Sequence, residues 1–281
     1  METSFTQFNS AIVGLIPIVL VVVAFFLNRY IKRWRKERIL NKAFPLAWTE
    51  ILNERMSVYP ILPEPQRHKL EQLIHIFLND KTFYGCAGLV ITDVMKVCIA
   101  AEACLLLVGQ SGSVYPKLQS ILVYPSAFRA KRDVHQEDGT VVAGEHHLLG
   151  ESWGNGRVIL SWDDVEQGAR DFTDGHNVVL HEFAHQLDSA SGSANGAPPL
   201  RHNSYHTWAS VFGDNFHDLQ ASAFHGKSTV MDTYGATNPA EFFAVATETF
   251  FEKPEQLNHR RPELFQELLK YYRLDPREWK Q

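Results

Sequence analysis

The chain has 281 residues, of which 45% are apolar and 12% aromatic, and its formal net charge is −5. This composition excludes a disordered or low-complexity protein, and three cysteines are too few for a disulfide-framed secreted scaffold. The charge is uneven, because residues 29–38 carry +5 and residues 39–281 carry −9. Since the bulk of the chain is acidic, we expect no direct binding of nucleic acid.

The first predicted element is a membrane-spanning helix. Residues 11–27 are uncharged and strongly apolar, and a helix of that length extends about 26 Å, within the range that crosses a bilayer. Six basic residues follow between 29 and 38, and no signal-peptide cleavage site separates them from the run. Because positive charge stays on the cytoplasmic side, we expect the rest of the chain to lie in the cytoplasm.

The remaining sequence predicts an α+β domain. Helical spacing of apolar residues marks 65–79, 93–108, 175–188 and 239–252, and Pro262 opens a last helix. Strands are expected at 121–125 and 157–162, the second in a hairpin with residues around 140–152. We therefore expect a helix-rich domain with a small, mostly antiparallel sheet. The predicted organisation is a short amino-terminal segment 1–10, a transmembrane helix 11–30, a basic juxtamembrane segment 31–40 and a large domain 41–281.

The motif His-Glu-Phe-Ala-His at 181–185 predicts a zinc site. Residues four apart share one helix face, so His181 and His185 can bind one Zn²⁺, and Glu182 lies beside the metal as a base for its bound water. Two histidines leave zinc under-coordinated. The metzincin extension would need glycine at 188 and histidine at 191, but the chain has Asp188 and Ser191 there.

An acidic residue on a later helix is the remaining route to a third ligand. Asn238 is a good helix cap and Pro239 a good first helical residue, which places Glu241 third in that helix. Glu241 is the preferred ligand, although it could instead complete a capping box, and Glu248 on the same face is a second candidate. Asp188 could orient an imidazole or simply be an exposed acid at a helix end.

Several stretches together resemble the Mlc titration factor A family of bacterial zinc metallopeptidases. The resemblance covers roughly residues 40–277, and it is far more specific than the zinc motif alone. Its motifs are HEFAHQLD at 181–188, YGATNPAEFFAVATETFF at 234–251, FYGCAGLVITDVM at 83–95, ILVYPSAF at 121–128 and VILSWDDV at 158–165.

The resemblance implies a zincin-like fold with one zinc ion per chain. It implies His181, His185 and Glu241 as ligands and Glu182 as the catalytic base. It also points to Tyr234 as a hydroxyl that stabilises the tetrahedral intermediate, the alternative being a packed loop aromatic. The known family member is soluble, modulates a glucose repressor and has aminopeptidase-like activity. The membrane segment of this chain departs from it, which puts the repressor partner in doubt.

These observations predict a single-pass zinc peptidase of the bacterial inner membrane, with its catalytic domain in the cytoplasm. It would hydrolyse peptide or protein substrates held along an edge strand at 157–162, and it would contact membrane lipid through its amino-terminal helix. The competing hypothesis is a metal-stabilised binding module that sequesters a transcriptional regulator at the membrane, with vestigial hydrolysis.

Overall fold

The structure is a computed structural model that describes residues 21–279 except 28, 32–33, 35–36, 41, 127–131, 136–140, 145–155 and 202–203. The chain divides into two units, Met1–Ala43 and Phe44–Gln281. In the first unit, every described residue from 21 to 40 is helical. Among the described residues, no helix combines the length and apolar content that crossing a membrane requires, and residues 11–20 of the predicted span lie outside that part of the chain.

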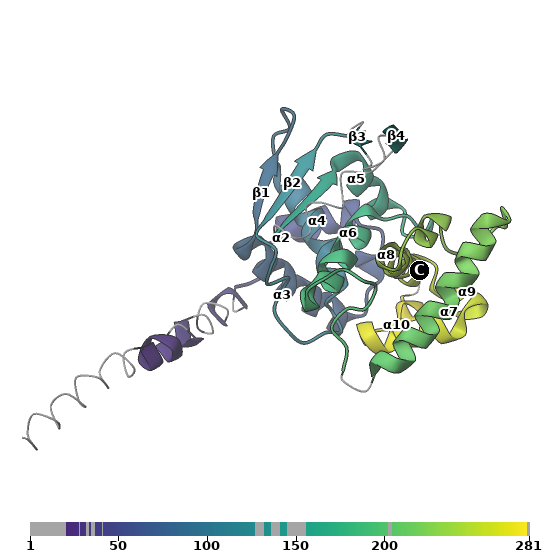
Figure 1. The fold of residues 1–281 in the computed structure, drawn as a ribbon. Helices are drawn as coiled ribbons and strands as arrows, with labels where there is room; N and C mark the ends of the chain where they lie inside the picture. The colour runs from purple at the N-terminus through teal and green to yellow at the C-terminus, as the bar shows by residue number, and fades with distance from the viewer. Residues whose placement is uncertain are drawn as a thin grey trace, which may run out of the picture. The chain divides into compact units, whose positions relative to one another are not determined.

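The second unit is mostly helical, which confirms the helix-rich α+β prediction (Figure 1). The helices predicted at 239–252 and from Pro262 begin at the expected residues, because Asn238 and Pro239 mark the first start and Pro262 marks the second. The helices are α2 (Leu46–Arg55), α3 (Glu64–Asp80), α4 (Asp93–Leu105), α5 (Trp162–Arg170), α6 (Val178–Asp188), α7 (Tyr205–Phe224), α8 (Pro239–Glu252), α9 (Pro254–Arg260) and α10 (Pro262–Tyr272), with short 3₁₀ turns η1 (Tyr59–Ile61), η3 (Ser189–Ser191), η5 (Thr233–Ala236) and η6 (Pro276–Glu278).

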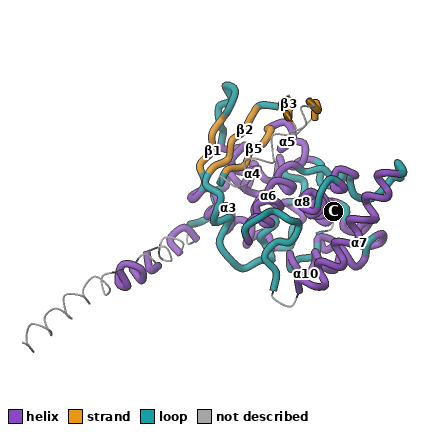
Figure 2. The backbone as a smooth tube through the Cα atoms, in the orientation of Figure 1, coloured by secondary structure: helices purple, strands orange, loops and turns teal. Residues whose placement is uncertain are grey.

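The main sheet is parallel, so the prediction of a mostly antiparallel sheet is wrong. Its strands β1 (Thr82–Gly85), β2 (Ser120–Tyr124) and β5 (Arg157–Ser161) stand in the order β1–β2–β5 (Figure 2). Helix α4 lies between β1 and β2 in the chain, and such a crossover is what joins parallel neighbours. β2 and β5 are apolar runs buried at most positions, as parallel strands are.

Of the hairpin predicted between residues 140–152 and 157–162, residues 140 and 145–152 lie outside the described part of the chain. β5 pairs with β2, while the antiparallel pair is β3 (Arg132–His135) with β4 (Val141–Gly144). The glycine before β5 nevertheless has a structural role. Gly156 has φ +67°, and a Cβ there would lie 2.7 Å from the carbonyl oxygen of Lys117. This glycine therefore permits close approach to the chain leading into β2.

Helices α6 and α8 form the centre of the second unit. They pack against each other, and α6 also contacts α4 and β5. In Figure 1 the strands lie on one side of this pair and helices α7, α9 and α10 on the other. Phe183 of α6 packs on Phe77 of α3 and on Tyr115, with ring centroids 5.7 and 4.8 Å apart. The polar side chains of α6 and α8 are therefore enclosed by apolar layers.

Candidate metal centre

The start of α6 is fixed by an asparagine cap. The side-chain oxygen of Asn177 accepts a hydrogen bond from the backbone N–H of Leu180 at 2.9 Å. The helix therefore begins one turn before His181, and His185 follows one turn later on the same face. The two imidazole centroids are 4.9 Å apart, and both side chains are buried.

Helix α8 brings Glu241 to the same place. Asn238 caps it, because its side-chain oxygen accepts from the backbone N–H groups of Ala240 and Glu241 at 3.0 Å each. Pro239 is the first helical residue, so Glu241 occupies the third position, as predicted. The positive end of the helix favours an ionised carboxylate there. Asn238 does the capping, and the carboxylate of Glu241 faces the imidazoles.

Three side chains converge in a geometry that fits a metal ion. The Nε2 atom of His181 lies 2.9 Å from Oε2 of Glu241 and 3.2 Å from Nε2 of His185, and the third separation is 3.4 Å. Tetrahedral zinc with ligands ~2.0–2.1 Å away would separate them by about 3.3 Å. All three residues are buried, and their ligand atoms lie within 4.8 Å of one another. Two imidazoles and one carboxylate are also a donor set that zinc accepts.

The carboxylates around the group attract positive charge. Burial alone would lower the pKa of His181, but Glu248 and Glu241 raise it well above its usual value. Burial lowers the pKa of His185 to about 4, so this imidazole is neutral, as a metal ligand must be. For Glu241, burial opposes ionisation, but hydrogen bonds with His181 and His185 lower its pKa to about 2.

Glu182 and Tyr234 lie near the group. Glu182 follows His181 on α6 and is fully buried. Tyr234 lies in η5, is 42% exposed, and its ring centroid is 6.0 Å from that of His181. Burial and the charges of Glu241 and Glu182 raise the pKa of Tyr234 to about 12. Its hydroxyl therefore keeps its proton at neutral pH and can donate a hydrogen bond.

Glu248 lies on the opposite side of the His181 ring from Glu241. One of its oxygens is 2.7 Å from Nδ1 of His181, and the other accepts a 2.8 Å hydrogen bond from the backbone N–H of Asn177. A carboxylate that binds Nδ1 fixes the ring so that Nε2 faces the group. Sequence reasoning left Glu248 open as a ligand, and the structure places it instead behind a histidine.

Two further buried acids lie behind the group. The side-chain amide of Asn177 donates to Glu102 of α4 at 2.8 Å, and the backbone N–H of Gly175 donates to Glu252 of α8 at 2.8 Å. Burial raises the pKa of Glu102 to about 8 and that of Glu252 to about 9. We call Glu102, Glu248 and Glu252 the acidic layer.

Sequence reasoning did not assign the roles of Asn177, Glu102 and Glu252. Asn177 carried a usable signal, because asparagine directly before an amphipathic run is a helix cap. Glu102 carried a weaker one, as a charge inside an apolar helix that must find a partner. Asp188, which sequence left open, is fully buried, so the alternative of an exposed acid is wrong. It accepts from the backbone N–H of Gly196 at 2.7 Å.

Comparison with known proteins identifies relatives along most of the chain. The family model described as glucose-regulated metallo-peptidase M90 matches residues 31–273. An uncharacterized protein of Synechocystis is 45% identical over 246 residues, which cover 86% of this chain and 89% of the relative. Proteins named Mlc titration factor A from Yersinia pestis and Yersinia pseudotuberculosis are each 34% identical over 234 residues, covering 82% of this chain and 84% of theirs.

Proposed function

Because the chain belongs to the glucose-regulated metallo-peptidase M90 family, we propose that it is a zinc-dependent peptidase that hydrolyses peptide bonds with an activated water. The observation that carries the proposal is the convergence of His181, His185 and Glu241 in one buried group beside Glu182. Bound zinc would polarise the scissile carbonyl and make the attacking water more acidic.

The chain's own residues supply the proton transfers and the orientation. Glu182 takes the proton of the attacking water and delivers it to the departing amine. The Tyr234 hydroxyl, protonated at neutral pH, donates a hydrogen bond to the oxygen that gains negative charge. Glu248 holds the ring of His181, so that Nε2 faces the ligand group.

An extended peptide would bind along β5. This strand pairs with β2 on one side and stands at the edge of the described sheet. Edge strands bind extended peptides through backbone hydrogen bonds. We propose aminopeptidase-like specificity within a regulatory role, which predicts faster cleavage of peptides with a free amino terminus than of the same peptides after acetylation.

The Glu182→Gln variant tests the mechanism. It keeps the size of the side chain and removes the base, so we expect about one zinc per chain and a loss of peptide hydrolysis of ~10²-fold or more. Metal content and turnover are measured on the same full-length preparation. Glu54→Gln is the matched control, because the side chain of Glu54 is 71% exposed and it stands on α2. Full activity in Glu182→Gln would exclude the proposed base.

The second candidate is a metal-stabilised module that binds a transcriptional regulator at the membrane. The name Mlc titration factor A, carried by the Yersinia relatives, favours a regulator as the partner. A pull-down separates the two candidates. A partner retained equally by wild type and Glu182→Gln, with no turnover of any peptide, would support the binding module, whereas turnover that disappears in Glu182→Gln supports the enzyme.

We propose further that residues 11–30 anchor the protein in the bacterial plasma membrane, with the metal centre on the cytoplasmic side. The uncharged run 11–27 and the basic residues that follow it support this topology. Carbonate extraction of membranes tests the anchor. If residues 11–30 span the membrane, the full chain stays in the membrane pellet. Protease added to intact spheroplasts should leave the 44–281 unit uncut, and its cleavage would reverse the orientation.

A further inference from the structure

A hollow outside the metal centre lies between α7, α9 and the segment 227–231, and Lys253 also lines it. It encloses about 680 Å³ and contains none of the residues of the metal group or the acidic layer. Its floor is apolar, because Leu219 and Met231 both line it and both are almost fully buried. Its volume falls within the range of ~300–1,000 Å³ that small-molecule sites occupy. We call this hollow the cationic cavity.

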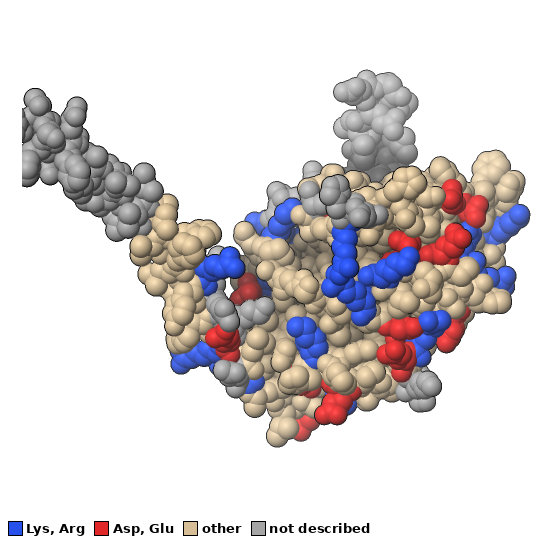
Figure 3. Space-filling model, turned by 90° about the horizontal axis from the view of Figure 1, so that it is seen from below, with Lys and Arg blue, Asp and Glu red and all other residues tan. Residues whose placement is uncertain are grey.

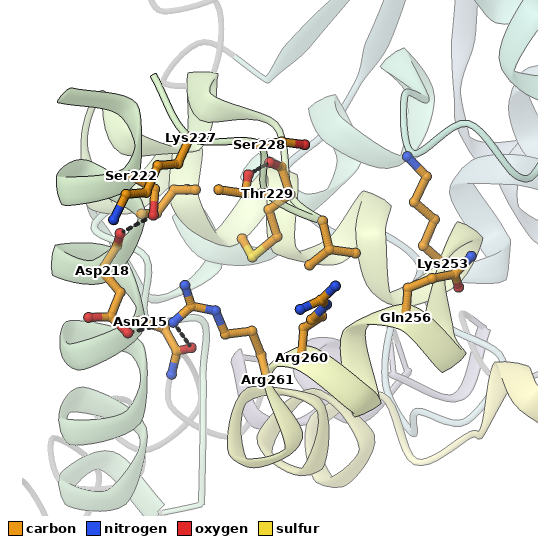
Figure 4. A pocket seen from close by; sticks show the side chains of 13 residues that line it. Asn215, Asp218, Ser222, Lys227, Ser228, Thr229, Lys253, Gln256, Arg260 and Arg261 are labelled. Atoms are coloured by element: carbon orange, nitrogen blue, oxygen red, sulfur yellow. Dashed lines mark hydrogen bonds and ion pairs between the residues drawn. The ribbon is translucent and has the colours of Figure 1, made fainter. Parts of the chain in front are cut away.

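Positive charge dominates its walls. Figure 4 shows Lys227 on one side of the view, Lys253 on the other and Arg260 between them. Within the described residues, none of these three cations has a carboxylate oxygen inside 4.0 Å, in contrast to Arg261, which pairs with Asp218 at 2.6 Å. The single acid of the lining is thus already neutralised. Figure 3 shows one face of the molecule, on which both basic and acidic side chains occur.

One of the cations lies beside a glycine. Lys253 follows α8 directly, and its ammonium end lies against Gly175. A Cβ at Gly175 would fall 2.9 Å from Nζ of Lys253, and Gly175 has φ +80°, which glycine adopts without strain. Glycine at this position therefore leaves room for the lysine.

The charge and the shape together define a class of ligand. The lining carries more positive than negative charge, and this excess attracts an anion into the hollow. Lysine and arginine both pair strongly with phosphate oxygens, and the hydroxyl of Ser228 and the amide of Gln256 add neutral donors on the same walls. A single carboxylate would leave most of the charge unmatched. The apolar floor accepts a small organic group attached to the phosphate.

We infer that the cationic cavity is a binding site for a small phosphate-bearing anion, either inorganic phosphate or a phosphate monoester. The inference is independent of the proposed peptidase activity, since it uses no residue of the metal centre. The cavity is adjacent in sequence to that centre, because Met231 precedes Asp232, which caps the η5 turn carrying Tyr234.

Methionine methyl NMR on the full chain in detergent tests this inference. The chain has four methionines, and Met231 alone among the described ones lines the cavity, while Met56 and Met95 are buried elsewhere. Inorganic phosphate and glycerol phosphate are titrated separately against chloride at matched ionic strength. We expect the Met231 signal, assigned with Met231→Leu, to shift saturably with at least one probe, while the Met56 and Met95 signals stay in place.

Two substitutions on the cavity wall test whether the shift of the Met231 signal depends on the basic side chains. Lys227 and Arg260 are both exposed, so Lys227→Gln and Arg260→Gln should fold normally, and each should weaken phosphate affinity about tenfold. Arg170→Gln removes a 61% exposed arginine on α5 and should leave the affinity unchanged. Tighter binding of glycerol phosphate than of inorganic phosphate would identify an ester as the ligand, and tighter binding of inorganic phosphate would identify the free ion. The absence of a saturable Met231 shift with either probe, or equal affinity in all three variants, would overturn the inference.

Discussion

Glu241 and Glu252 stand on the same helix, three turns apart. At neutral pH the carboxyl group of Glu241 is ionised, whereas that of Glu252 is protonated and neutral. Burial disfavours ionisation at both positions. At Glu241 the imidazoles of His181 and His185 outweigh the effect of burial and lower the pKa to about 2. At Glu252 the charges of Asp174 and Glu248 add to the effect of burial, and the pKa rises to about 9.

Both residues are buried glutamates, so the contrast shows that the charged groups around each carboxyl decide whether it is ionised. Helix α8 therefore has two parts with different roles. Its amino-terminal part presents an ionised carboxylate that a divalent cation can bind. The acidic layer farther along contains Glu102 and Glu252, which hold their protons at neutral pH, and Glu248, which bridges His181 and Asn177. Ligand residues should therefore be sensitive to any substitution, whereas residues of the acidic layer should give graded effects.

The strongest test of this division is removal of a ligand. In His185→Ala we expect metal content to fall from about one ion per chain to near zero, and peptide hydrolysis to disappear with it, because two ligands cannot retain zinc against buffer. Metal content is measured by mass spectrometry on the purified full chain. His206→Ala on α7 is the control, since His206 is exposed. A stoichiometry that stays near one in His185→Ala would refute the ligand assignment.

The next largest effect is expected for Tyr234→Phe. If its hydroxyl donates to the developing oxyanion, kcat should fall by ~10²–10³-fold with little change in KM or in metal content. Tyr205→Phe is a matched control, because Tyr205 is 41% exposed and Tyr234 is 42% exposed. If the two variants lose equally little activity, Tyr234 is a packed aromatic and contributes nothing to the chemistry.

A smaller effect is expected for Glu248→Gln in the acidic layer. Glutamine can accept from only one of the two groups that Glu248 now serves, the His181 ring and the Asn177 backbone. We expect zinc affinity to weaken by ~10–100-fold while one ion still binds at saturation. Competition with a chromophoric chelator measures it, and Glu255→Gln on α9 is the exposed control. If Glu248→Gln bound zinc with wild-type affinity, the contact of Glu248 with the His181 ring would not contribute to metal binding.

Sequence patterns predicted the ligand helices well because their signals are local. The motif 181–185 and the Asn238–Pro239 start of α8 each lie within one or two helical turns, and both hold in the structure. The sheet was mispredicted because strand pairing joins residues far apart, and the turn signal at Gly156 serves a different neighbour. Helix α7 was missed because only Trp208, Phe212 and Leu219 are buried along its length, which leaves little apolar periodicity. The acidic layer joins α4, the start of α6 and α8, so no single stretch of sequence displays it.

The last expected effect concerns folding stability and not activity or metal binding, and it is a change in how stability depends on pH. The pKa of Glu102 is raised by burial from 4.5 to about 8, against the hydrogen bond from Asn177. Between these values the folded chain binds a proton that the unfolded chain has released. Stability from this group is therefore complete below pH 4.5 and is lost as pH rises to about 8, by at most ~1.4 kcal/mol per pH unit.

Glu102→Gln copies the protonated side chain at every pH and should remove this loss. Measured as the midpoint of thermal unfolding from pH 5 to pH 8.5, the variant should gain stability over wild type as pH rises. Glu252 titrates in both proteins, so its contribution cancels in the difference. Glu54→Gln, at a side chain 71% exposed, should follow the wild-type curve. Parallel curves for Glu102→Gln and wild type would mean that Glu102 is ionised in the fold, and the charge contrast between the acidic layer and Glu241 would then rest on Glu252 alone.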